Sequence, residues 1–172
     1  VARYALLLAD AADLDAREQA NVERVALFHD IGKIDEALFD IIHDHTQLTP
    51  EELRAVKTHP QRGADVLAPL AAFYPDLAHG VLSHHERWDG TGYPRELRRN
   101  AIPLAARIVT IADAFDAMTF TRRYRGAKSF DEASARLMEG RGKQFDPDLV
   151  DLFLSPPVFA AAMAILREDH VP

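Results

Sequence analysis

Cysteine is absent from this chain of 172 residues, which excludes a scaffold held together by disulfides. Long apolar runs are absent too, because none approaches the roughly 18 residues that a membrane span needs. The first residues do not have the pattern of a secretory signal. These absences predict a cytoplasmic location and no membrane span in this chain.

An excess of positive charge is also lacking, since the formal net charge is −7. A chain with this charge is not expected to bind the backbone of a nucleic-acid polymer broadly. A local exception is a basic stretch that contains Arg122, Arg123, Arg125 and Lys128. A small anion could bind there even though the protein is acidic.

Alternation of apolar and polar residues with a period of two does not persist anywhere in the sequence, so no strand is predicted. Apolar residues instead recur at helical spacing, and 172 residues are enough for one domain with a sizeable core. We therefore predict a single all-α domain, a bundle of helices. The expected helices cover residues 1–14, 16–30 (stopping at Gly32), a segment starting at Thr49-Pro50, 61–70 after a boundary at His59-Pro60, 76–86, 103–119, 129–140, a segment opened by 146–148, and a last one after Pro156-Pro157 and ending near Asp169.

Six side chains that bind first-row metals stand at or near the ends of these expected helices. Neutral imidazoles and carboxylates suit iron, manganese and zinc, and one carboxylate can bridge two ions. A helical scaffold that points these groups inward could hold two metals close together, an arrangement that cleaves phosphate esters. The alternative for any one histidine is a core residue that is hydrogen-bonded and binds no metal. A rival group of candidate ligands, His43-Asp44-His45, is interpreted as part of a surface loop. The six residues are His29, Asp30, His59, His84, His85 and Asp113.

Several motifs around these residues resemble one known family. Residues 29–33 (HDIGK) are similar to the signature of the HD superfamily of metal-dependent phosphohydrolases. Residues 84–94 (HHERWDGTGYP) resemble the motif that names the HD-GYP subfamily, and this string is long and specific. The similarity continues through 102–108 (IPLAARI), 112–117 (ADAFDA) and 144–147 (QFDP), so that it covers nearly the whole chain.

The resemblance implies an HD-domain helical bundle with a buried site for two or three divalent ions, often iron or manganese. It also implies hydrolysis of cyclic di-GMP to linear pGpG, to GMP, or to both. By the matching motif positions, His29, Asp30 and Asp113 would hold one metal. Asp30 would bridge to a second metal, held by His59, His84 and His85. Two cations offset the charge of the phosphodiester and lower the pKa of a bridging water, whose hydroxide would attack phosphorus.

The resemblance gives roles to further polar residues. Lys33 could contact a non-bridging phosphate oxygen or support the leaving group, and is otherwise a solvated lysine. Arg122 and Arg125 match positions where basic residues bind substrate phosphates, and arginine suits bidentate phosphate contacts; the alternative is a solvated run of charge. Asp116, three residues beyond Asp113, is expected either to orient a ligand or to pair with an arginine.

The chain departs from the family pattern in two respects. The family usually places one more metal-binding histidine on the helix that comes before residue 1, so we expect that the start of the first helix is missing from view. Glu96 and Arg99 stand where glycine is typical, and a positive φ there would cost about 1 kcal/mol.

Three hypotheses about function follow. The leading one is a cyclic di-GMP phosphodiesterase that forms the output domain of a longer signalling protein. The second is a phosphohydrolase with another nucleotide substrate, and the third is a catalytically inactive module that binds cyclic di-GMP or docks to a protein. A signalling partner is expected to contact the loop at Gly92-Tyr93-Pro94, and a homodimer is possible.

Overall fold

The computed structural model describes residues 1–34, 48–119 and 129–169. All regular elements in these ranges are α-helices or 3-10 helices, and the one β-type feature among them is an isolated bridge between Arg141 and Phe145. The prediction of an all-α fold is therefore confirmed. The elements are α1 (Ala2–Ala11), α2 (Ala16–Phe28), η1 (Ile31–Ile34), α4 (Pro50–Val56), α5 (His59–Leu67), η2 (Ala68–Leu70), α6 (Leu77–Ser83), η3 (Arg99–Ala101), α7 (Leu104–Thr119), α8 (Phe130–Gly140), α9 (Pro147–Phe153) and α10 (Pro156–Asp169).

Side-chain caps fix where several helices begin. Thr49 and Ser129 each accept a hydrogen bond from the backbone three residues on, where a glutamate returns the contact, so both form capping boxes at helix starts that were predicted from the sequence. Asp146 accepts from the backbone N–H groups of Asp148 and Leu149 at the start of α9. These short-range contacts are readable from sequence, and the predicted starts agree with the structure.

Other helix ends differ from the prediction. Helix α6 ends at Ser83 rather than near residue 86, so His84 and His85 follow the helix instead of continuing it. The predicted break before the last helix is present but lies at Leu154 and Ser155, because Pro156 and Pro157 belong to the first turn of α10, where proline is tolerated. The predicted boundary at His59-Pro60 is confirmed, since α5 begins at His59.

Gly32 was predicted to stop the second helix, and this is wrong. Helix α2 already ends at Phe28, and Gly32 is buried inside η1. A Cβ at this position would lie 2.0 Å from the carbonyl oxygen of His59 and 2.6 Å from the backbone nitrogen of Gly63. Glycine is needed here because η1 and α5 touch backbone to backbone, which brings Asp30 close to His59.

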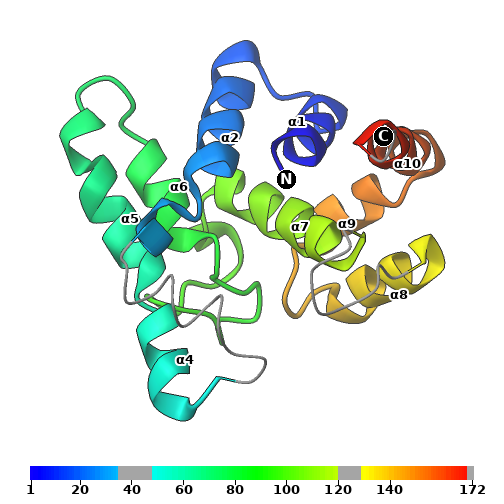
Figure 1. The fold of residues 1–172 in the computed structure, drawn as a ribbon. Helices are drawn as coiled ribbons and strands as arrows, with labels where there is room; N and C mark the ends of the chain where they lie inside the picture. The colour runs from blue at the N-terminus through cyan, green and yellow to red at the C-terminus, as the bar shows by residue number, and fades with distance from the viewer. Residues whose placement is uncertain (35–47, 120–128, 170–172) are drawn as a thin grey trace.

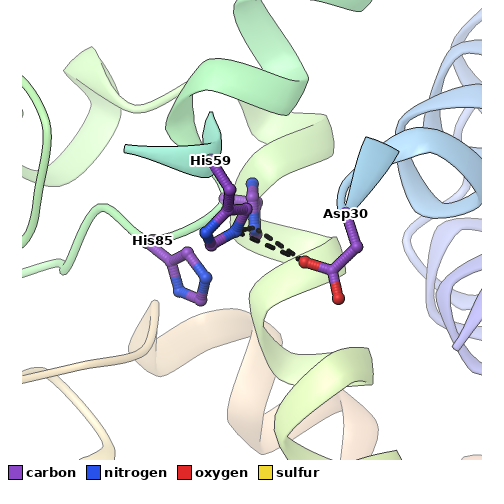
Figure 2. A group of neighbouring side chains, drawn as sticks. Asp30, His59 and His85 are labelled. Carbon is purple, nitrogen blue, oxygen red and sulfur yellow. Dashed lines mark hydrogen bonds and ion pairs between the residues drawn. The ribbon is translucent and has the colours of Figure 1, made fainter. Parts of the chain in front are cut away.

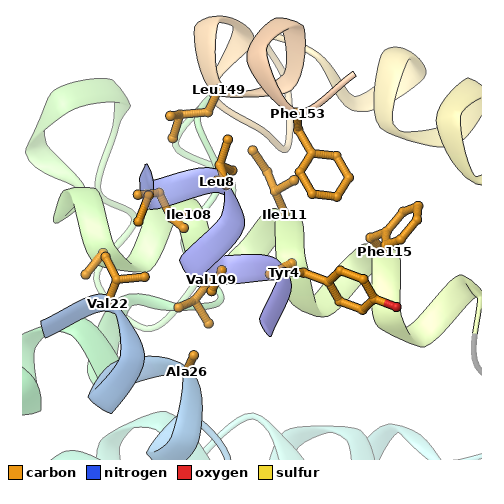
Figure 3. Close-up of a cluster of buried hydrophobic side chains, with 14 of the residues drawn as sticks. Tyr4, Leu8, Val22, Ala26, Ile108, Val109, Ile111, Phe115, Leu149 and Phe153 are labelled. Carbon is orange, nitrogen blue, oxygen red and sulfur yellow. The ribbon is translucent and has the colours of Figure 1, made fainter. Parts of the chain in front are cut away.

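Helix α7 lies in the middle of the bundle and packs against α1, α2, α6, α8 and α9 (Figure 1). The core on its α1 side is apolar and aromatic, with Tyr4, Leu8 and Phe153 around Phe115 (Figure 3). The Phe115 ring meets the rings of Tyr4 and Phe153 edge to face, each at 5.1 Å between centroids. This core fixes α7, and α7 carries Asp113 toward the site described below.

In the described residues, none of the helices is by itself long and apolar enough to cross a membrane. By length and composition, α9 and α10 pass that test when joined, although the chain bends by 68° between them.

Candidate metal centre

Four of the six predicted ligands converge at one point. Ligand atoms of Asp30, His59, His84 and His85 all lie within 4.8 Å of one another. Asp30 comes from the turn between α2 and η1, His59 from the start of α5, and the two adjacent histidines from the end of α6. Figure 2 shows the Asp30 carboxylate pointing across the gap toward His59, with His85 beyond it. We call these four residues the cluster.

His29 and Asp113 lie on the other side of the Asp30 carboxylate. The Nε2 atom of His29 is 3.6 Å from Asp30 Oδ2 and 3.7 Å from Asp113 Oδ1. By contrast, the atom that approaches the Nε2 atoms of His59 and His84, at 3.3 and 3.9 Å, is Asp30 Oδ1. The two oxygens of one carboxylate therefore face two different groups of ligands.

Backbone contacts fix the tautomers of three histidines. The Nδ1 atoms of His29, His59 and His84 lie 2.8, 2.7 and 2.6 Å from the carbonyl oxygens of the residues three positions before them. A carbonyl oxygen can only accept, so Nδ1 must carry the proton. In a neutral ring Nε2 then presents a lone pair, which is how a metal-binding histidine is usually oriented.

These lone pairs point at one another. The Nε2 atoms of His59 and His84 are 3.1 Å apart, and with both protons on Nδ1 neither nitrogen can donate to the other. Asp30 Oδ1 is buried and has no hydrogen-bond partner among the described residues. Both histidines are 1% exposed, so water is largely excluded from them. Facing acceptors repel one another unless a cation lies between them, so the donor set fits a divalent metal ion.

Electrostatics keep His84 and His85 in the form that binds metal. Burial, reinforced by the charge of His85, holds the pKa of His84 well below its usual value. Burial and the nearby His59 lower the pKa of His85 to about 3. Both imidazoles are therefore neutral at neutral pH, with lone pairs free for a metal.

The carboxylates are held in their charged form. Burial raises the pKa of Asp30, but the neighbouring imidazoles and Lys33 outweigh it, and the pKa lies well below its usual range. For Asp113, burial is likewise outweighed by His29, and the pKa is lowered. Burial lowers the pKa of His29, but the neighbouring carboxylates of Asp113 and Asp30 reverse this, so that its pKa is raised.

Of the other predicted site residues, the structure describes Lys33 and Asp116 and does not describe the two arginines. The Nζ atom of Lys33 is 2.7 Å from Asp30 Oδ2, so this lysine lies beside the cluster. Asp116 lies one turn after Asp113 and is partly buried, with its Oδ1 3.1 Å from the backbone nitrogen of Val1. Arg122 and Arg125, and the segment His43-Asp44-His45, lie outside the described residues.

Sequence reasoning missed the buried carboxylate that organises the loop after the cluster. Glu86 is 2% exposed and accepts hydrogen bonds from the backbone N–H groups of Arg95 and Leu97, at 2.7 and 3.0 Å. The loop is thereby folded back so that the Tyr93 ring stacks on His85, with centroids 4.9 Å apart. The one signal for this role is the place of Glu86 directly after two histidines in the motif at 84–94.

Two positions in this loop keep a glycine-like backbone without glycine. Glu96 has a φ of 54° and Arg99 a φ of 53°. A residue with a Cβ is strained there by about 1 kcal/mol. The positive φ considered for both residues is thus present; the hydrogen bonds to Glu86 come from the two neighbours of Glu96, and the N–H of Arg99 donates to the carbonyl oxygen of Trp88 at 3.1 Å.

One cavity lies beside the cluster, and a second cavity lies next to the first. One, of about 260 Å³, is lined by His85 together with Lys57, Tyr93 and Thr110. The other, of about 540 Å³, is lined by Ala114, which follows Asp113, and by residues of α8. Arg87 and Gln144 line both cavities, so the two are neighbours across one wall.

Comparisons with known proteins agree with this geometry. A family model described as an HD domain matches residues 1–149. A cyclic di-GMP phosphodiesterase of Vibrio cholerae is 40% identical over 151 residues, which are 84% of this chain and 30% of that protein. The 3'3'-cGAMP-specific phosphodiesterase 2 of the same organism is 33% identical over 156 residues, 90% of this chain and 30% of that protein. This chain thus spans less than a third of either relative. A crystal structure of a cyclic GMP-AMP-specific phosphodiesterase of V. cholerae has the same fold, with a TM-score of 0.68, 23% identity, and coverage of 97% of this chain and 46% of that one.

Proposed function

Because this chain belongs to the HD-domain family, we propose that it is a metal-dependent phosphodiesterase that hydrolyses cyclic di-GMP to linear pGpG, to GMP, or to both. One observation carries the chemistry: buried histidine lone pairs and an unpartnered carboxylate oxygen face a common centre. The relative with 40% identity, named as a cyclic di-GMP phosphodiesterase, supports the choice of substrate.

Two cation positions follow from the way Asp30 divides its contacts. The first would lie between His29, Asp113 and Asp30 Oδ2, and the second between Asp30 Oδ1 and the three other histidines. The distances on either side of the carboxylate support this division. Two divalent ions, iron or manganese, suit these nitrogen and oxygen ligands, and a third ion would need further ligands. When bound, the cations supply charge neutralisation of the phosphodiester and an activated water.

The chain's own residues would orient and neutralise the substrate. Lys33 pairs with Asp30 Oδ2 at 2.7 Å, and a cation on that oxygen would compete with it. The released ammonium group would then be close enough to contact a non-bridging phosphate oxygen or the departing ribose oxygen. Arg122 and Arg125 would bind the substrate phosphates, and Asp116 would steady the turn of α7 that carries Asp113.

A second candidate substrate is 3'3'-cGAMP, because one relative is named for it. The relative with 33% identity is named as a phosphodiesterase specific for 3'3'-cGAMP, which shares the phosphodiester ring of cyclic di-GMP but differs in one base. The metal cluster acts on the phosphate and does not distinguish these substrates. Their discrimination would fall to the cavities on either side of Arg87 and Gln144.

We also propose that the chain is the output domain of a longer signalling protein. Its coverage of 30% of each of the two curated relatives supports this. The loop at residues 92–94 would contact a signalling partner, and Pro94 at its tip is exposed.

The test is to purify the protein without oxygen, measure metal per chain, and follow turnover of cyclic di-GMP, 3'3'-cGAMP and a nucleotide monoester. We expect about two metals per chain and hydrolysis of a cyclic dinucleotide. The variant Asp30→Ala should lose both, whereas Asp10→Ala, which removes an exposed carboxylate on α1, should lose neither. Two metals without turnover of any cyclic dinucleotide would refute the proposed activity, and nucleotide binding without metal would favour an inactive binding module.

A further inference from the structure

We propose that Lys57 binds the second, non-scissile phosphate of the cyclic dinucleotide in the 260 Å³ cavity beside His85. This inference rests on the proposed function and adds a substrate-binding residue to it. Four observations carry it: the position of Lys57 relative to the cluster, the way its ammonium group is held, the charge of the cavity, and the cavity's size.

Lys57 is tied to the cluster through the backbone. It directly follows Val56, the last residue of α4, whose carbonyl oxygen accepts the Nδ1–H of His59 at 2.7 Å. One residue, Thr58, therefore separates this lysine from the proposed metal ligand His59, whose orientation depends on the peptide unit next to the lysine. The backbone of Lys57 therefore stays beside the cluster as long as His59 keeps this hydrogen bond.

The ammonium group is held by an aromatic ring rather than by a carboxylate. The Nζ atom of Lys57 lies over the Tyr93 ring, 5.3 Å from its centroid. The same ring stacks on His85, so Lys57 and the cluster share one intermediate side chain. A cation on an aromatic face keeps its full charge and remains able to bind an anion.

The other charged groups on the cavity wall are already paired. Arg87 donates to both carboxylate oxygens of Asp89 and to the hydroxyl group of Thr91. The carboxylate of Glu86 accepts hydrogen bonds from two backbone N–H groups of the loop. Over residues 1–34, 48–119 and 129–169, no carboxylate forms an ion pair with Lys57. Among the described residues that line this cavity, Lys57 is the cation without a carboxylate partner, and the ligand that would pair with it is an anion.

The volume of the cavity and its place next to His85 indicate which anion would bind there. A cavity of 260 Å³ is smaller than the roughly 300–1,000 Å³ of a site that encloses a drug-sized ligand, so it takes a part of the substrate. A cyclic dinucleotide has two phosphates across one small ring. When one phosphate is at the cluster, the other must be nearby, and the cavity that contains His85 is immediately adjacent. The larger cavity across Arg87 and Gln144 remains for a base.

The test compares Lys57→Met with Arg54→Met, which removes a positive charge from the exposed surface of the same helix. For Lys57→Met we expect the KM for cyclic di-GMP to rise about tenfold, with kcat within about twofold, because a charge-assisted contact of this kind is worth roughly 1.5 kcal/mol. Bis(p-nitrophenyl) phosphate, a diester with a single phosphate, should be hydrolysed equally well by both variants and the wild type. Metal per chain should be unchanged, and Lys57→Arg should restore most of the affinity for the cyclic substrate.

A second measurement uses salt. Raising the ionic strength should weaken cyclic di-GMP binding more in the wild type than in Lys57→Met, since one screened contact is gone from the variant. An unchanged KM, an equal loss on both substrates, or a loss of metal in Lys57→Met would each overturn the inference while the wild type still turns over the cyclic dinucleotide. A wild type that hydrolyses no cyclic dinucleotide would overturn the proposed function itself, and the inference with it.

Discussion

Two polar sites inside this molecule differ in how their hydrogen-bonding groups are paired. In the first, Arg107 donates to Asp146 at 2.6 Å and also to the carbonyl oxygen of Ile102, while Asp146 caps α9. In the second, the metal cluster, acceptors face acceptors and a carboxylate oxygen has no hydrogen-bond partner in the described residues. The first site pairs donors with acceptors, and the second does not.

The difference separates structural polar groups from functional ones. A buried polar network whose members are all paired holds elements together, and here it joins the start of α7 to the start of α9. A buried network of unpaired acceptors costs stability until a cation binds. We therefore expect variants of the cluster to lose metal and activity without unfolding the protein, and variants of the Arg107–Asp146 pair to do the reverse.

The largest effect is expected for Asp30→Asn. The amide keeps the shape of the side chain but removes the charge that would bridge two cations, so turnover should fall at least about a thousand-fold, equivalent to about 4 kcal/mol of transition-state stabilisation. Metal per chain and steady-state rate measure this. The urea unfolding curve of the metal-free variant should change by less than about 1 kcal/mol, because no hydrogen bond to Oδ1 is lost. A variant that keeps its metals and its rate would remove Asp30 from the mechanism.

Asp146→Ala should break the other site. It leaves the partly buried Arg107 without its carboxylate partner and removes the cap of α9, and we expect the two losses together to cost about 3 kcal/mol. Urea denaturation of metal-free protein measures the loss, and metal per folded chain should stay at the wild-type value. Asp148→Ala, an exposed carboxylate two residues on, serves as the control and should cost under about 1 kcal/mol. Loss of metal in a folded Asp146→Ala protein would contradict the separation of the two sites.

The sequence reveals these two sites to different degrees. The caps at Thr49, Ser129 and Asp146 are local, because a side chain contacts a backbone group two or three residues away, and they could be predicted. The proposed metal ligands were predicted from their residue types near helix ends and from the family motifs, and four of them come together. The orientation of each ring depends on a carbonyl group three residues before it, which a motif does not display.

The features that could not be predicted all depend on distant contacts. The need for Gly32 arises from the approach of a carbonyl group 27 positions later in the chain, that of His59. Glu86 could not be assigned as a buried acceptor because its partners are backbone groups of a loop whose path was unknown. The role of Lys57 depends on a tyrosine ring from another segment.

Manganese binding should raise the free energy of unfolding through the cluster and should not depend on the Arg107–Asp146 pair. At a manganese concentration about a hundred times the dissociation constant, the wild type should gain about 2.7 kcal/mol of unfolding free energy. Asp146→Ala should gain the same amount from its lower starting value, whereas Asp30→Asn should gain almost nothing. Thermal unfolding with and without a chelator measures this, and an equal gain in all three proteins would mean that manganese binds elsewhere.

A smaller effect is expected at Gly32, where stability and metal binding are coupled. In Gly32→Ala the added Cβ would clash with the backbone of His59 and Gly63, forcing η1 and α5 apart. We expect a loss of about 2 kcal/mol of stability together with weaker metal binding. The control Gly142→Ala has a positive φ of 72° but open space around it, so it should cost about 1 kcal/mol and leave metal affinity unchanged. Equal metal affinity in both variants would show that the contact between η1 and α5 does not position the ligands.

Anomalous diffraction from crystals grown with manganese tests the central claim most directly. The account predicts two peaks, one on either side of the Asp30 carboxylate: the first among Oδ2, His29 and Asp113, and the second among Oδ1, His59, His84 and His85. Crystals of a folded protein with no peak at this carboxylate, although manganese is present at saturating concentration, would contradict it.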